Sequence, residues 1–197
     1  MKGKINIILT GVGGQGVITA ANILGKAALK EKVNVFVSEV HGMAQRGGSV
    51  NCSVRLGDVS GPLVSSGTAD VILSTEPIEA LRYINYSNMN TKIITDINPV
   101  VPYTVSVGEE KYPEIEEVFK ELSKYGKLFK LDAVKLSKDA GALITKNIVM
   151  LGALAATNVL PFSSEKLLET ILENVPKKFA AMNRRAFEGG LKAIKND

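Results

Sequence analysis

The chain has 197 residues, 45% of them apolar, and its 24 Lys and Arg residues only slightly outnumber its 20 Asp and Glu residues. This length and apolar content predict one compact domain over residues 1–197. The small basic excess is dispersed and tryptophan is absent, which argues against a nucleic-acid-binding surface. No apolar run reaches the roughly 18 residues of a membrane span. We therefore expect a cytoplasmic protein that binds neither nucleic acid nor membrane.

The first predicted elements are a strand, a tight turn and a helix. Residues 4–11 (KINIILTG) are apolar and β-branched, which predicts a strand, and apolar residues recur at helical spacing through residues 15–32. Residues 33–38 (VNVFVS) predict a second strand. Together these segments predict a βαβ unit with a right-handed crossover.

The middle of the chain predicts further strands and two helices. The strands are expected over residues 49–56, 70–74 and 92–96. A short helix is expected over residues 77–83, where a proline suits the first turn, and another near residues 114–125. Between them, residues 97–113 contain three prolines, which predicts irregular or edge structure.

The single cysteine, Cys52, lies in the strand predicted over residues 49–56. Strand alternation places Val50, Cys52, Val54 and Leu56 on one face and Asn51, Ser53 and Arg55 on the other. We expect Cys52 to lie in the core, as free cysteine usually does. One cysteine also excludes an intrachain disulfide, a cysteine-paired zinc site and an iron–sulfur cluster held by this chain.

The last third of the chain is predicted to be mostly helical. The helices are expected over residues 131–141, 144–158, 163–175 and 175–194. In the last of them one apolar face is expected to dock onto the sheet, made of Phe179, Met182, Ala186, Phe187, Gly190, Leu191 and Ile194. The predicted fold is a single three-layer α/β/α sandwich, Rossmann-like, with a mainly parallel sheet and a helical C-terminal third.

A glycine-rich turn, GVGGQG, follows the first strand and opens the first helix. It places Gly11, Gly13 and Gly16 in the spacing G-x-G-x-x-G, which permits a tight turn and lets a pyrophosphate approach the backbone at a helix N-terminus. A dinucleotide site also needs an acidic residue about 20 positions on. Neither Glu31 nor Glu39 meets that requirement cleanly. The turn therefore predicts either a phosphate-bearing ligand or a purely structural role for its glycines.

A second glycine-containing loop, within SEVHGMAQRGGSV, follows the second predicted strand. In a Rossmann-like sheet this loop lies at the carboxyl edge, beside the glycine turn. Gly47 and Gly48 allow close approach of a ligand or another chain, and Arg46 offers planar donors to phosphate or carboxylate. His41 is the only histidine, so no histidine-pair metal site is expected, and its role is either acid–base chemistry or hydrogen bonding.

Four segments together carry a resemblance to a known family: GVGGQGVITAANILGKAA, SEVHGMAQRGGSVNCSVRLG, SGTADVILSTEPIEALR and TKNIVMLGALAATNVLP. They resemble the beta subunits of indolepyruvate ferredoxin oxidoreductases. These subunits are equivalent to the gamma-type subunit or domain of the 2-oxoacid:ferredoxin oxidoreductases. The resemblance spans nearly the whole chain.

The resemblance implies oxidative decarboxylation of an aryl 2-oxoacid with coenzyme A, giving an acyl-CoA, carbon dioxide and reduced ferredoxin. It implies that thiamine diphosphate and 4Fe-4S clusters reside on a larger alpha subunit, since this chain has neither a GDG…N thiamine signature nor cysteine runs.

The resemblance also implies residue roles. The turn nearest a coenzyme A phosphate would comprise Gly13, Gly14, Gln15 and Gly16, and Gly11 is grouped with them as a cofactor-binding residue. The second loop would line the interface close to substrate and cofactor through Arg46, Gly47, Gly48 and Ser49. Arg46 and His41 are the catalytic candidates, and Asn147 is a further candidate that helix capping explains equally well.

Two alternatives from other classes stay open at this point. One is a stand-alone NAD(P)-binding reductase that uses the same glycine turn. The other is a noncatalytic scaffold subunit whose glycines serve only the turn.

Overall fold

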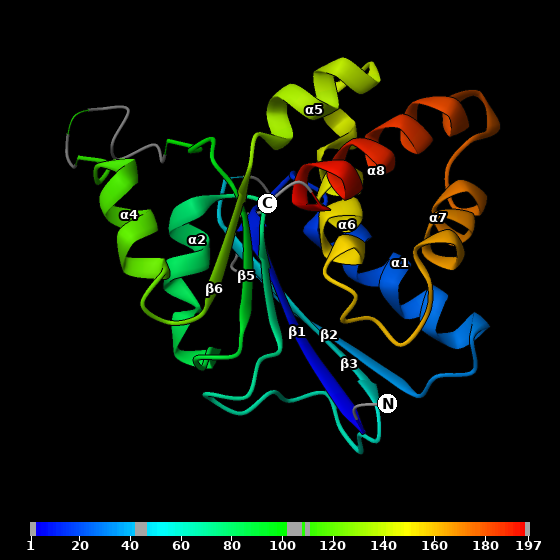
Figure 1. The fold of residues 1–197 in the computed structure, drawn as a ribbon, viewed down its shortest axis with the longest axis horizontal. Helices are drawn as coiled ribbons and strands as arrows, with labels where there is room; N and C mark the ends of the chain where they lie inside the picture. The colour runs from blue at the N-terminus through cyan, green and yellow to red at the C-terminus, as the bar shows by residue number, and fades with distance from the viewer. Residues whose placement is uncertain (1–2, 42–46, 102–107, 109–110, 196–197) are drawn as a thin grey trace.

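The computed structural model describes residues 3–41, 47–101, 108 and 111–195. Its centre is a six-stranded sheet with the order β2-β3-β1-β4-β5-β6 (Figure 1). The strands are β1 (Lys4–Val12), β2 (Val35–His41), β3 (Ser49–Gly57), β4 (Val71–Ser74), β5 (Lys92–Asp96) and β6 (Lys127–Leu131). The helices are α1 (Val17–Lys30), α2 (Pro77–Arg82), α4 (Ile115–Leu122), α5 (Ala133–Ala140), α6 (Lys146–Ala156), α7 (Ser164–Glu173) and α8 (Ala180–Lys195). Short 3-10 turns occupy Ile84–Tyr86, Leu143–Thr145 and Lys177–Phe179.

The sheet is mixed but mostly parallel, which confirms the predicted fold class. β4 pairs in parallel with β1 and with β5, and β5 pairs in parallel with β6. β3 runs antiparallel to both β1 and β2. β1 and β2 therefore point the same way without touching each other. The predicted βαβ unit is therefore corrected in one respect: its two strands are not neighbours in the sheet, because β3 lies between them.

Helices cover both faces of the sheet, as a three-layer sandwich requires. In Figure 1, α2 and α4 lie on one face, and α1, α5, α6, α7 and α8 gather on the other. The larger apolar cluster lies on the side of α1 and α6, and the smaller one lies beneath α2 and α4. The predicted inward face of β3 is confirmed: Cys52, Val54 and Leu56 have no exposed surface. Burial raises the pKa of the Cys52 thiol to about 12, and the Glu39 carboxylate adds to the rise.

The C-terminal helices form as predicted, with one change in how the last of them docks. Ser163 caps α7 by accepting a hydrogen bond from the Lys166 amide at 3.4 Å. α8 packs chiefly against α6, so a helix lies between most of α8 and the sheet. Phe179 precedes α8 and is 40% exposed, so its predicted place on the apolar face is wrong.

β6 is the strand that the sequence did not predict. Its segment, KLFKL, contains two lysines and forms the edge of the sheet, where charged side chains reach solvent. Those charges conceal the alternation that places Leu128 against the α2–α4 side and Phe129 against the other. Among the described residues, no helix is long and apolar enough to cross a bilayer.

Candidate functional site at the carboxyl edge of the sheet

The candidate site lies at the carboxyl ends of β1 and β4. From β1 the chain continues through α1 to β2, which lies on one side of β1 within the sheet, whereas β4 lies on the other side of β1. The carboxyl ends of β1 and β4 thus form a topological switch point, the usual place of a ligand in such sheets. The glycine turn follows β1, and Thr75 and Glu76 follow β4.

The glycine turn adopts a conformation that requires glycine. Gly14 and Gly16 have φ angles of 98° and 77°, which side-chain-bearing residues rarely adopt. A Cβ on Gly11 would lie 1.9 Å from Thr75 Oγ1, so a side chain there would displace Thr75. A Cβ on Gly14, in contrast, would meet no heavy atom within 4 Å. The turn is therefore packed at Gly11 and open at Gly14.

The two glycine loops are joined directly, as the sequence predicts. The Gly13 amide donates to the Gly48 carbonyl at 2.8 Å, and the Gly47 amide donates to the Gly13 carbonyl at 3.3 Å. Because the Gly13 amide is engaged in this way, Gly13 serves to join the loops. The next N–H groups, in the first turn of α1, are those that a helix leaves without an intrahelical partner.

Gln15 has a defined orientation. Its Oε1 accepts hydrogen bonds from the Val12 amide at 2.8 Å and from Thr75 Oγ1 at 2.6 Å. A backbone amide can only donate, so the atom facing Val12 must be the carbonyl oxygen of the Gln15 side chain. Both hydrogen bonds are made to that oxygen. The NH₂ group at the other end of the amide is the donor group of the Gln15 side chain.

Asn147 braces the same turn from α6. Its side-chain amide donates to the Gly16 carbonyl at 3.4 Å, and a Cβ on Gly16 would lie 2.7 Å from Asn147 Nδ2. The alternative of a helix cap is wrong, because the N-cap of α6 is Thr145. A cavity of about 10 Å³ lies below the turn, lined by Thr10, Thr75, Asn147 and apolar neighbours.

Ser49 turns toward the protein at the start of β3. Its hydroxyl donates to Glu79 Oε2 at 2.5 Å and lies 3.3 Å from the Tyr83 hydroxyl. Glu79 also accepts from Arg82 Nε at 3.2 Å. Ser49 therefore anchors the second loop to α2, a role that the sequence did not indicate.

Two carboxylates at the same edge were missed by sequence reasoning. Glu76, 2% exposed, accepts from the Tyr112 hydroxyl at 2.5 Å, from the Val100 amide at 3.3 Å and from the Glu79 amide at 2.9 Å. Burial and the bond to Glu76 raise the pKa of Tyr112, which keeps this hydroxyl protonated. Asp96, at the end of β5, is fully buried and pairs with Lys146. The only sequence signal was their position at the ends of strands.

The catalytic candidates fall at the margin of what the structure describes. Arg46 lies outside the described residues. For His41 only the backbone is described, at the end of β2, where it pairs in register with Val50 of β3. Within the described residues, no group of three or more His, Cys, Asp and Glu side chains is arranged to hold a metal ion.

The sheet, the switch point and the glycine turn at a helix N-terminus define an α/β protein with a Rossmann-like candidate ligand site. Residues 6–193 match the family of pyruvate ferredoxin/flavodoxin oxidoreductases. The chain belongs to this family, which confirms the resemblance seen in its sequence.

Individual relatives agree with this assignment. The chain is 50% identical over 195 residues to indolepyruvate oxidoreductase subunit IorB of Thermococcus kodakarensis, covering 98% of this chain and 96% of that protein. Its fold matches the gamma subunit of a keto/oxoacid ferredoxin oxidoreductase from Geobacter sulfurreducens, with a TM-score of 0.72, 24% identity, and 98% and 99% of the two chains covered. It also matches part of the 2-oxoglutarate:ferredoxin oxidoreductase of Magnetococcus marinus, solved with 2-oxoglutarate, coenzyme A and succinyl-CoA bound. That match has a TM-score of 0.77 and 20% identity, and covers 100% of this chain and 32% of the other.

Proposed function

We propose that this chain is the small subunit of a thiamine- and coenzyme A-dependent 2-oxoacid:ferredoxin oxidoreductase that acts on indolepyruvate and other aryl 2-oxoacids. The observation that carries the proposal is the 50% identity, over nearly the whole chain, to a subunit named for indolepyruvate. In this proposal residues 1–197 form a single gamma-type catalytic domain. The complex converts the 2-oxoacid and coenzyme A to acyl-CoA and carbon dioxide and passes the electrons to ferredoxin.

The proposal assigns the redox cofactors to a larger alpha subunit. Thiamine diphosphate supplies the decarboxylation chemistry, and 4Fe-4S clusters carry the electrons. This chain does not fit a cluster, because its only cysteine, Cys52, is buried in the core with a pKa near 12. Cluster ligands are thiolates, and a thiol held neutral in a packed core is a poor one.

The proposed coenzyme A contact is the glycine turn. Gly14 offers open space, and the side-chain oxygen of Gln15 is already occupied by two donors. The first N–H groups of a helix have no partner within the helix and attract anions. The related enzyme from Magnetococcus marinus contains coenzyme A, which supports this ligand class. The second loop, with Arg46 and His41 as the proposed catalytic residues, is tied to the turn through Gly47 and Gly48.

The sheet topology disfavours the alternative of a stand-alone NAD(P) reductase. In a dinucleotide site the acidic residue that holds the ribose ends the strand next to β1. Here β3 occupies that position, and Glu39 on β2 pairs in register with Cys52 of β3. Glu31 is the C-cap of α1, and its Oε1 lies 3.8 Å from Lys166 Nζ. Neither glutamate is placed for a ribose.

The test is affinity purification of the tagged chain from its native host under anaerobic conditions, with thiamine and iron assayed in the eluate. We expect a larger subunit to co-elute with both, and we expect indolepyruvate with coenzyme A to reduce ferredoxin or a dye. Elution of the chain alone with a bound nicotinamide cofactor would overturn the proposal. Co-elution with an enzyme that keeps its full activity without this chain would favour the scaffold alternative.

A further inference from the structure

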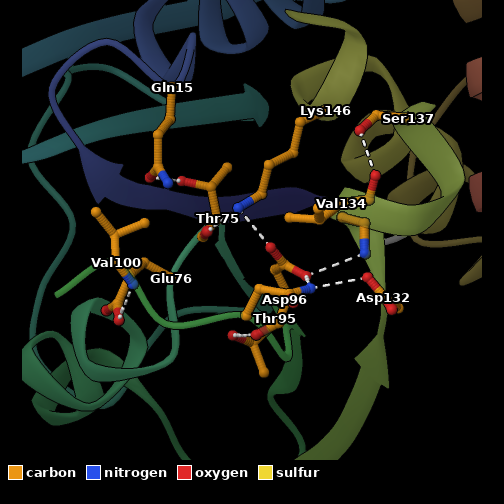
Figure 2. A network of polar contacts seen from close by, with 12 residues as sticks. Gln15, Thr75, Glu76, Thr95, Asp96, Val100, Asp132, Val134, Ser137 and Lys146 are labelled. Atoms are coloured by element: carbon orange, nitrogen blue, oxygen red, sulfur yellow. Dashed lines mark hydrogen bonds and ion pairs between the residues drawn. The ribbon is translucent and has the colours of Figure 1, made fainter. Parts of the chain in front are cut away.

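A chain of buried polar contacts connects the end of β5 to the glycine turn (Figure 2). It begins at Asp96, which has no exposed surface and forms an ion pair with Lys146 at the start of α6. Lys146 Nζ also donates to the Thr75 backbone carbonyl at 2.8 Å. The Thr75 hydroxyl in turn donates to Gln15 Oε1 at 2.6 Å.

The ion pair is held rigidly from the side away from the turn. Asp96 Oδ1 accepts from the Ala133 amide at 3.0 Å and from Asn98 Nδ2 at 2.9 Å. The same Asn98 nitrogen donates to Asp132 Oδ1 at 2.8 Å. With Asp96 anchored in this way, the ammonium group of Lys146 has a defined position. A buried ion pair contributes little net stability compared with apolar residues of the same size, but it does define geometry.

Thr75 transmits that geometry to the turn. Its carbonyl is held by Lys146, and its hydroxyl lies against Gly11, where any Cβ would come within 1.9 Å of Oγ1. The hydroxyl carries one proton and has two acceptors in reach, Gln15 Oε1 at 2.6 Å and the Thr10 carbonyl at 3.4 Å. The shorter contact assigns that proton to Gln15.

We propose that Asp96, Lys146 and Thr75 are positioning residues that hold the Gln15 side chain so that its NH₂ group donates to a phosphate of coenzyme A. The inference rests on the proposed function and adds three residues from separate segments to the coenzyme A site. Two donors occupy Oε1, so the amide cannot flip without losing both bonds. A preoriented donor binds its ligand more tightly, because no side-chain entropy remains to be lost.

The first variants separate positioning from stability in the intact complex. Thr75→Val removes the hydroxyl and keeps the shape, and Thr75→Ser restores the hydroxyl. The matched control is Thr91→Val. Thr91 directly precedes β5, at the end of the sheet opposite the carboxyl edge. Thr91 is fully buried, and its hydroxyl donates to the Ala69 carbonyl at 2.6 Å. Assembly and melting temperature are measured for every variant, because a lost buried hydrogen bond also destabilises the fold.

The expected result is a selective change in the KM for coenzyme A. Thr75→Val raises this KM about tenfold, the effect of one hydrogen bond. The kcat at saturating coenzyme A and the KM for the 2-oxoacid stay within about twofold, because the proposed contact of Gln15 is with a phosphate of coenzyme A and not with a reacting atom. Thr75→Ser recovers most of the wild-type KM. Thr91→Val lowers the melting temperature without a change in the KM for coenzyme A.

Two further variants test the two ends of the contact chain. Gln15→Glu keeps an oxygen for Val12 and Thr75 but replaces the NH₂ donor with a negatively charged oxygen, so the KM for coenzyme A rises roughly a hundredfold. The double variant Asp96→Asn with Lys146→Met removes both buried charges together and avoids leaving one unpaired. It raises the KM for coenzyme A about tenfold, as Thr75→Val does.

The outcomes distinguish the inference from the function on which it rests. If the wild-type complex shows no coenzyme A-dependent activity, the proposed function fails before any variant is made. If the wild type depends on coenzyme A but Thr75→Val and Thr91→Val have the same KM for it, the positioning role is refuted and the function stands. A Gln15→Glu complex that binds coenzyme A normally would also refute it.

Discussion

Glycines serve opposite purposes at the α6–α8 contact and at the glycine turn. Between the helices, a Cβ on Gly152 would lie 2.0 Å from the Phe187 carbonyl, and a Cβ on Gly190 would lie 1.9 Å from the Val149 carbonyl. In the turn, a Cβ on Gly14 would meet nothing within 4 Å. Gly152 and Gly190 allow the backbones of α6 and α8 to approach each other closely, whereas Gly14 leaves open space at the surface. Structure, and not residue type, distinguishes a packing glycine from one in the proposed ligand site.

One helix connects the two regions. α6 is buried along its whole length. At its start, Lys146 donates to the Thr75 carbonyl and Asn147 donates to the Gly16 carbonyl of the glycine turn. Further along, Gly152 packs against α8. Changes in the packed region should therefore appear as lost stability, and changes at the carboxyl edge should appear as altered ligand binding and pH response.

The largest effect on stability is expected from Gly190→Ala. The added methyl group meets the backbone of α6, which cannot move aside as a side chain could, so we expect the free energy of unfolding to fall by about 3 kcal/mol. Urea denaturation of the purified protein measures it. The control is Gly189→Ala, whose Cβ would meet only Leu136 Cδ2 at 3.6 Å. It should be neutral or stabilise by up to about 1 kcal/mol, since alanine favours helix. Equal effects at the two positions would contradict the packing argument.

Gly14→Ala is expected to have a small effect on stability and a large effect on coenzyme A binding, the reverse of Gly190→Ala. The φ angle of 98° makes alanine strained there, so we expect a loss of stability of about 1 kcal/mol, without any steric clash. In the assembled complex the methyl group would occupy the open space above the turn and raise the KM for coenzyme A about tenfold. Kinetics at varied coenzyme A, combined with urea denaturation, separates the two effects. A stability loss with an unchanged KM would show that the space is not part of the ligand site.

Asp132 gives the carboxyl edge a pH dependence. The Lys135 amide and the Asn98 side chain stabilise its carboxylate and lower its pKa. This stabilisation is present above the unfolded-state pKa of about 3.9 and is lost as the pH falls through the lower folded-state value. Asp132→Asn keeps a helix cap but has no charge to lose. Denaturation curves from pH 6 to pH 2 should show the advantage of the wild type shrinking below about pH 4. A constant difference would contradict the assignment.

The smallest effect is expected from alkylating treatment of the native protein, because Cys52 lies on the buried face of β3. Because the thiol is buried and its pKa is near 12, it should resist alkylation at pH 8 in the folded protein and react only on unfolding. Mass spectrometry after treatment with iodoacetamide, with and without urea, measures this. Rapid labelling of the native protein would show that the β3 face opens readily.

The sequence by itself determined the strand–turn–helix at the N-terminus, most of the strands and the family. These features depend on local patterns: β5 is a short apolar run between polar residues, and the glycine spacing reports backbone angles that only glycine adopts readily. The meeting of Gly13 with Gly47 and Gly48 was also predictable, because loops at the carboxyl edge converge near the switch point.

Only the tertiary structure decided the rest. Strand alternation shows which face of β3 is buried but not which strands it joins, so its position between β1 and β2 could not be predicted. The lysines of β6 hid an edge strand. Asp96, Lys146, Thr75 and Gln15 come from four separate segments, and no local pattern marks them as partners. Their contacts exist because parallel strands bring distant residues to the same edge of the sheet, where buried polar groups must find partners.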